Sequence, residues 1–437
     1  MSRRLALLWA PLLLCWAGPT AFAQSQASSV AVPSRAALAR LGLERQWVTV
    51  APVGGSERVL RISRGQDYLF VQTNQGFIHA YDVETGRPVW SAQVGEHSSN
   101  AMPISQNSYA VFASSANVLT ALDRHTGRTI WRHGLGSSPT SGTTADDDHV
   151  VVGMGTGMLR CFDLREEEGD RPVKIRSTPK LSWNLATGGA VRTRPLFGDR
   201  IVCFGSDDGR TYVSLKNEPT NLYRVSTGGP IGAELASHGT RSLLIPSADF
   251  NLYSVDVLTA KIQWVFPSGA PISQGPIVAQ DSIFVINDRG DLSVLDPTSG
   301  EAKWTTATDH GKFLGVSPTK VYLLSPDNDL VVVARDSGKV LLDPAATFRR
   351  AGLDLREFTL SFPERFDDRL FLATQSGVIL GLREVGATTP QPLQPPSDKP
   401  FGYVPPEGIT EIHNPFEAAP ADTDPDAEPD DMTQRPF

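Results

Sequence analysis

Cysteine is scarce in this sequence of 437 residues, which contains three in all. Cys15 lies in an apolar stretch near the N-terminus, so only Cys161 and Cys203 remain for the rest of the chain. Two cysteines exclude a fold held together by several disulfides. Both lie within apolar runs typical of strands. We therefore expect two buried free thiols, with a single bridge between them as the alternative.

Patterns that mark metal, nucleic-acid and catalytic sites are also absent. None of the eight histidines has a partner at a metal-binding spacing. Lysine and arginine are not clustered, and the formal net charge is −8, which argues against a nucleic-acid partner because phosphate binding needs clustered cations. No candidate nucleophile has an identifiable general base. The sequence therefore predicts no catalytic residue, no metal site and no cofactor.

A long hydrophobic run is missing too. The apolar stretch from Leu5 to Ala17 is shorter than the ~20 residues that a membrane-spanning helix needs. Two arginines precede it and an Ala-Phe-Ala cleavage site follows, so residues 1–23 are predicted to be a signal peptide for export to the periplasm or cell envelope. A lipid anchor at Cys15 is disfavoured because Leu14, rather than a small residue, precedes it. Membrane contact is expected to be indirect.

Residues 387–437 have a different composition from the rest of the chain. They contain twelve prolines, ten acidic residues and two basic ones, and so carry the full net charge of −8. Proline at this density opposes regular strand pairing, and few aromatic residues are present to offset the entropy of ordering. We predict a disordered acidic tail that serves as a linker or docking segment.

One pattern recurs through the middle of the chain. It reads Asp82-x-x-Thr-Gly86-x-x-x-Trp90, and it returns from Asp123 to Trp131, from Asp296 to Trp304 and, with alanine in place of glycine, from Asp256 to Trp264. The aspartate can accept backbone N–H groups across a turn, and glycine adopts a positive φ at little cost. Tryptophan then opens the next strand with a large surface to bury. The pattern predicts short strands joined by tight turns.

The tryptophan of each repeat, or the residue in its place, is expected on the outer strand of a sheet. The spacing of these outer-strand markers indicates the architecture. They recur at intervals of 38 to 52 residues, and the longest interval contains the charged insertion 164–180. A repeat of ~40–45 residues is the size of one four-stranded propeller blade. The eight structural blade positions are Trp47, Trp90, Trp131, Trp183, Tyr223, Trp264, Trp304 and Leu342. We therefore predict an all-β protein: an eight-bladed β-propeller over residues 46–386.

The two ends of this region are expected to close the ring. Only one strand, around Trp47, precedes the first complete blade, and only three strand-like runs follow Leu342. The N-terminal strand should therefore complete the last blade by pairing near Val378, which leaves no open sheet edge. Residues 24–45 form a lead with a short helix, capped by Ser34 and ended by Gly42.

The segments His79-Ala-Tyr-Asp82, Thr120-Ala-Leu-Asp123 and Ser293-Val-Leu-Asp296, each followed by the glycine and tryptophan, resemble the quinoprotein, or PQQ-like, propeller repeat. Two branches share this repeat: quinone-dependent dehydrogenases and non-enzymatic envelope proteins of the BamB type. The dehydrogenases carry adjacent cysteines beside the quinone, and no Cys-Cys pair occurs here. In size, blade number, export signal and terminal clasp the chain is similar to the BamB branch, which implies a role in outer-membrane protein assembly.

The resemblance implies a non-catalytic scaffold for other envelope proteins, acting as a monomer within a complex. The alternatives are a PQQ-dependent oxidoreductase and a carbohydrate- or matrix-binding propeller. Turns between the second and third strands of the blades should gather around one mouth of the channel and bind a basic or polar segment of a partner. The candidate partner-binding residues are Asp207, Asp208, Asn287, Asp288, Arg289, Asp327 and Asn328.

Overall fold

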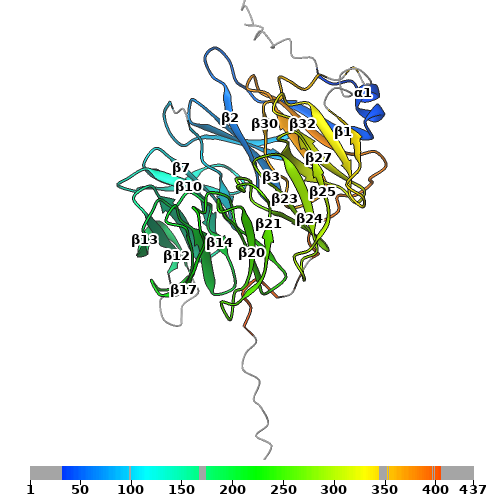
Figure 1. Cartoon of the computed structure of the whole chain (residues 1–437). Helices are drawn as coiled ribbons and strands as arrows, with labels where there is room; N and C mark the ends of the chain where they lie inside the picture. Colours follow the sequence, from blue (N-terminus) through cyan, green and yellow to red (C-terminus); the bar gives the residue numbers. More distant parts are fainter. Residues whose placement is uncertain are drawn as a thin grey trace, which may run out of the picture.

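The computed structural model describes residues 32–97, 100–166, 174–343, 352, 354–395, 397 and 399–404. Within them, eight four-stranded antiparallel sheets stand side by side as the blades of a β-propeller (Figure 1). The predicted fold class is confirmed. The predicted signal peptide, with Cys15, lies outside the described residues.

The first four blades follow one another along the chain, each from its inner to its outer strand. Blade 1 has β2 (Val59–Arg64), β3 (Tyr68–Thr73), β4 (Phe77–Asp82) and β5 (Pro88–Gln93); blade 2 has β6 (Ser105–Gln106), β7 (Ala110–Ser115), β8 (Val118–Asp123) and β9 (Thr129–Gly134). Blade 3 has β10 (Pro139–Ala145), β11 (His149–Met154), β12 (Met158–Glu166) and β13 (Lys174–Ala186); blade 4 has β14 (Leu196–Phe197), β15 (Ile201–Gly205), β16 (Arg210–Leu215) and β17 (Asn221–Ser226).

The remaining blades repeat this order until the last one. Blade 5 has β18 (Ala236–His238), β19 (Ser242–Pro246), β20 (Asn251–Asp256) and β21 (Ile262–Pro267); blade 6 has β22 (Ile277–Ala279), β23 (Ser282–Ile286), β24 (Asp291–Leu295) and β25 (Ala302–Ala307). Blade 7 has β26 (Lys312–Val316), β27 (Lys320–Leu324), β28 (Leu330–Ala334) and β29 (Val340–Leu342); blade 8 has β30 (Leu360–Ser361), β31 (Leu370–Ala373), β32 (Val378–Glu384) and β1 (Leu43–Val50).

The eighth blade joins the two ends of the propeller. β1 lies next to β32 (Figure 1). The two strands pair antiparallel, with Trp47 opposite Gly381 and Val50 opposite Val378. The expected clasp is therefore present. Helix α1 (Arg35–Arg40) precedes β1, with Ser34 accepting a hydrogen bond from Ala37 N at its start and Gly42 at a φ of 72° after its end. The short helix matches its prediction.

The outer-strand markers hold neighbouring blades together. All eight lie on outermost strands, as expected from the repeat. Trp90 Nε1 donates to the carbonyl of Arg124 at 2.8 Å, in the turn that follows the third strand of the next blade. The glycine of that turn, Gly127, has a φ of 70°, and a Cβ placed on it would lie 2.6 Å from the Trp90 ring. The repeated tryptophan and glycine thus form one contact between successive blades.

The hydrophobic core is divided among the interfaces between blades. In the described residues, each of eight buried clusters combines side chains of two adjacent blades. The stability of the fold therefore depends on every blade having a neighbour on both sides. The charged insertion prolongs the β12–β13 hairpin, where Arg165 pairs with Ile175. No helix among the described residues is long and apolar enough to cross a membrane.

Candidate functional site

The predicted partner-binding turns share one face of the ring. Asp207 and Asp208 lie between β15 and β16, residues 287–289 lie between β23 and β24, and residues 327–328 lie between β27 and β28. Each is the turn from the second to the third strand of its blade, so all open on the same side of the propeller. We call this side the turn face.

Some of these polar side chains form hydrogen bonds that stabilise the turn face itself. The Asp208 carboxylate accepts hydrogen bonds from Gly188 N at 2.9 Å and from Tyr212 Oη at 2.5 Å. Gly188 belongs to the connection that enters the blade, so the carboxylate ties this connection to the turn. Burial alone would raise the pKa of Asp208, but these hydrogen bonds to the charged form lower it. Asp249 makes the equivalent bonds in blade 5, and Asn287 Nδ2 donates to Ser268 O in blade 6.

Replacing Asp208 by alanine should therefore lower the free energy of unfolding by about 1–3 kcal/mol, because its two donors lose their acceptor. The neighbouring Asp207→Ala is the matched control: its ion pair with Arg192 is partly exposed and should contribute less than about 1 kcal/mol. Because the folded pKa of Asp208 is lowered, its contribution is present above the ordinary value of 3.8 and is lost as the pH falls below it. Urea titrations of both variants at pH 7 and pH 3 measure the difference, and equal losses at pH 7 would contradict the structural role.

Other predicted residues remain accessible to a partner. The Arg289 side chain is 64% exposed and pairs with Asp291 at 3.1 Å. Asp207 pairs with Arg192 at 2.7 Å, where the arginine side chain is 58% exposed. Asp288 is exposed and accepts a hydrogen bond from Ser273 Oγ. This part of the turn face therefore presents charges of both signs rather than an acidic surface.

Phe250 lies between these charged turns and was not among the predicted residues. Its side chain is 50% exposed, and its φ is 74°. The turn from the second to the third strand contains a residue with a positive φ in every blade, and these residues are Gly76, Ala116, Gly157, Gly209, Phe250, Gly290, Asn328 and Gly377. A bulky residue in this left-handed conformation costs roughly 1–2 kcal/mol. A comparison of the eight turns in the sequence could have revealed it, because glycine is the residue that this conformation favours.

The described residues contain no group of three or more histidine, cysteine or carboxylate side chains placed to hold a metal ion. Cys161 and Cys203 are both free and buried, as expected. Burial raises the pKa of each thiol, so neither is an activated nucleophile at neutral pH.

The fold and the inter-blade contact of glycine and tryptophan define an eight-bladed propeller of the PQQ-like class. The chain belongs to the family described as outer membrane protein assembly factor BamB, whose model matches residues 25–222 and 214–379. The outer membrane protein assembly factor BamB of Yersinia pestis is 20% identical over 322 residues, which are 71% of this chain and 70% of that protein.

Solved structures show the same architecture. BamB from Moraxella catarrhalis superposes with a TM-score of 0.63 at 16% identity and covers 79% of this chain and 99% of its own. The computationally designed protein Ika8 gives a TM-score of 0.57 at 16% identity, covering 75% of this chain and 96% of its own. At this level of identity the likeness shows the fold alone, because a computationally designed protein matches nearly as well.

Proposed function

We propose that this protein is an exported, non-catalytic scaffold that binds another cell-envelope protein during outer-membrane protein assembly. Membership of the BamB family supports a role in outer-membrane protein assembly. Phe250, which is exposed on the turn face in a strained backbone conformation, supports the turn face as the surface that binds the partner. An aromatic side chain kept at an unfavourable backbone position indicates selection for something other than stability.

The surroundings of Phe250 suit a protein partner. Large aromatic anchors ringed by polar groups dominate the energy of protein–protein interfaces. Phe250 supplies the anchor, while the Arg192–Asp207 pair of blade 4 and the exposed Arg289 of blade 6 supply charges on either side. The partner surface should therefore offer an apolar pocket flanked by charged groups of both signs.

Replacing Phe250 by glycine should separate binding from stability. We expect the free energy of unfolding to rise by about 1 kcal/mol, because the left-handed strain is relieved, while retention of outer-membrane assembly components by the tagged full-length protein falls at least tenfold. Leu258→Ala is the control: Leu258 is 38% exposed on the opposite face of the same blade and should leave retention unchanged.

Quantitative mass spectrometry of the purified complexes and urea titration give the two readouts. Unchanged retention by Phe250→Gly would show that another surface binds the partner. If the unmodified chain retains no outer-membrane assembly component at all, the proposed process itself is wrong.

A further inference from the structure

Two adjoining cavities lie among the inner strands of the propeller. A channel cavity of about 300 Å³ is lined by residues of β2 and of the segments next to β14, β18, β22 and β30. A second cavity of about 480 Å³, which we call the rim cavity, is lined by the first turns of blades 1 and 2 and by residues 194–197. Arg64, Arg194 and Phe366 line both, so the two cavities adjoin.

Cations outnumber carboxylates along these walls. Arg194 and Arg365 share a single carboxylate, Glu234, at 3.3 and 3.4 Å. Arg61 lines the same channel cavity, and its guanidinium donates to a carbonyl oxygen, Ala101 O at 2.7 Å, rather than to a carboxylate among the described residues. Three arginines thus face one carboxylate, an excess of two positive charges. Burial lowers the pKa of Arg61 and Arg365, as expected where cations are crowded without enough counter-charge.

The other arginines of the two cavities do not add to this excess. Arg64 forms ion pairs with Glu364 at 2.8 Å and with Asp367 at 2.7 Å, and Arg124 is paired with Asp67. The unmatched charge is therefore concentrated at Arg61, Arg194 and Arg365, whose planar guanidinium groups suit carboxylate ligands.

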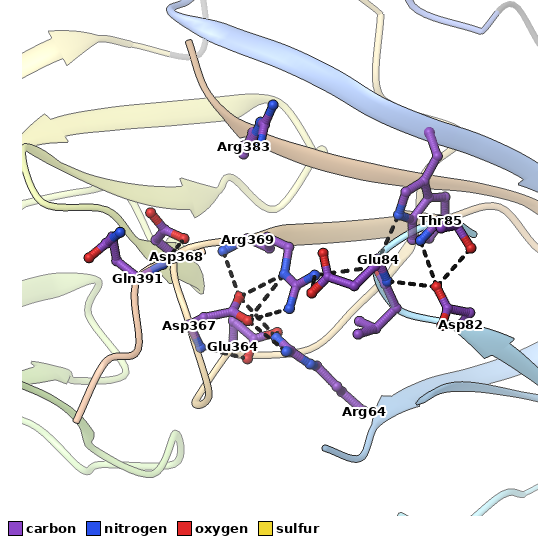
Figure 2. Close-up of polar contacts among 12 residues, drawn as sticks. Arg64, Asp82, Glu84, Thr85, Glu364, Asp367, Asp368, Arg369, Arg383 and Gln391 are labelled. Carbon is purple, nitrogen blue, oxygen red and sulfur yellow. Dashed lines mark hydrogen bonds and ion pairs between the residues drawn. The ribbon is translucent and has the colours of Figure 1, made fainter. Parts of the chain in front are cut away.

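The start of the Pro-rich segment leads the chain to this site. Gln391 N donates to Asp368 at 2.9 Å (Figure 2), and Leu393 is buried against blades 6 and 7. Further on, Phe401 is 8% exposed in the core between blades 4 and 5, and its carbonyl accepts a hydrogen bond from Asp199 N at 2.6 Å. Phe197, two residues before Asp199, lines the rim cavity. Gly402 N then donates to Thr240 O at 2.8 Å, so the described chain reaches Val404 after contacts with the first turns of blades 4 and 5.

The segment after Val404 has the complementary charge. Residues 405–437 contain nine acidic residues and one arginine, a net charge of −8. Thirty-three residues can span roughly 100 Å when extended, so length does not limit access to a cavity lined by the neighbouring residues 194–197.

We propose that the acidic segment 405–437 binds in the rim and channel cavities of its own propeller, with its carboxylates on Arg61, Arg194 and Arg365. Covalent attachment gives it an effective concentration in the millimolar range. It then competes with acidic segments of other proteins for these arginines. This inference concerns the channel and does not depend on the partner surface proposed above.

The test uses the full-length chain in two forms, the unchanged chain and one whose nine acidic residues after Val404 are replaced by asparagine or glutamine. The probe is a fluorescein-labelled synthetic peptide of residues 405–437, and fluorescence anisotropy reports its binding. We expect the neutralised form to bind the peptide at least tenfold more tightly than the unchanged chain, whose own segment competes. Binding should weaken as salt is raised from about 50 to about 300 mM.

Substitutions in the neutralised form locate the site. Arg61→Gln should weaken peptide binding about tenfold, and Glu234→Gln should strengthen it, because it adds one unmatched positive charge. Arg132→Gln, on the outer strand β9, is the matched control and should change nothing. Because Glu234→Gln is expected to strengthen peptide binding, a misfolded variant cannot produce the expected result. Absence of peptide binding by the neutralised form at the lower salt concentration, or equal effects of Arg61→Gln and Arg132→Gln, would overturn the proposal.

Discussion

Replacing Arg64 by methionine should lower the free energy of unfolding by about 3–5 kcal/mol, because the buried Glu364 then loses its cation and Asp367 loses one of its two. Arg64 ends β2 of the first blade, whereas Glu364 and Asp367 belong to the connection between β30 and β31 of the last blade (Figure 2). The side chains of Arg64 and Glu364 are 3% and 1% exposed. This network therefore joins the first and last blades inside the protein, next to the β1–β32 clasp.

A second arginine shares the network. Arg369 pairs with Asp367 at 2.6 Å and with Glu84 of the first blade at 2.7 Å (Figure 2). Burial alone would raise the pKa of Asp367, but the hydrogen bonds and charges of Arg64 and Arg369 lower it to about 2. Asp367 therefore stabilises the fold above its ordinary pKa of 3.8, and this contribution is lost as the pH falls through about 2.

Two comparisons make the Arg64 result specific. Combining Arg64→Met with Glu364→Gln should recover a large part of the loss, because Glu364 no longer carries an unpaired buried charge and Asp367 keeps its pair with Arg369. Arg383→Gln breaks the partly exposed pair with Glu44 in the clasp and should cost less than about 1 kcal/mol. Guanidinium chloride titrations followed by tryptophan fluorescence measure these variants and the unchanged protein. A loss below about 1 kcal/mol for Arg64→Met would show that the network does not stabilise ring closure.

Gly127→Ala should lower the free energy of unfolding by about 2–4 kcal/mol. The positive φ costs alanine roughly 1–2 kcal/mol, and its Cβ would meet the Trp90 ring at 2.6 Å, which adds the cost of overpacking, about 1–3 kcal/mol. The equivalent position in blade 5 is already alanine, Ala260, with a φ of 59°. There the preceding blade presents the smaller Tyr223, whose hydroxyl donates to Val257 O at 2.6 Å.

The blade-5 arrangement supplies the test. Trp90→Tyr in the Gly127→Ala background should cost less than Trp90→Tyr alone, because the smaller ring makes room for the Cβ. A double-mutant cycle from thermal and chemical unfolding gives this coupling. Strictly additive losses would show that the glycine acts through its backbone conformation only, without contact to the tryptophan.

The architecture could be predicted because its determinants are local. Each Asp-x-x-Thr-Gly-x-x-x-Trp segment contains its own turn: Asp82 Oδ1 accepts from Glu84 N and Thr85 N at 3.1 and 2.8 Å. Strand alternation and turn residues repeat within some forty residues, so counting them gives the number of blades. The single strand before the first complete blade and the three strands after the seventh together predicted the clasp.

The candidate binding residues were harder to predict. The sequence placed them correctly in turns, because turn residues are chosen by local backbone conformation. It could not show that Asp208 is tied to Gly188, or that Phe250 stands exposed between charged turns, because these properties depend on how one blade lies against the next. The Pro-rich segment was expected to stay disordered as a whole, yet Leu393 and Phe401 are buried against distant blades.

The sequence by itself determined the repeating blade, the number of blades and the strand that closes the ring, since burial pattern and turn chemistry act over short distances. Only the tertiary structure decided which charges meet. Arg64 and Asp367 are 303 residues apart, and Arg61, Arg194 and Arg365 come from three separate blades. A closed ring brings such residues together through the geometry of all eight blades, and no local pattern records that proximity.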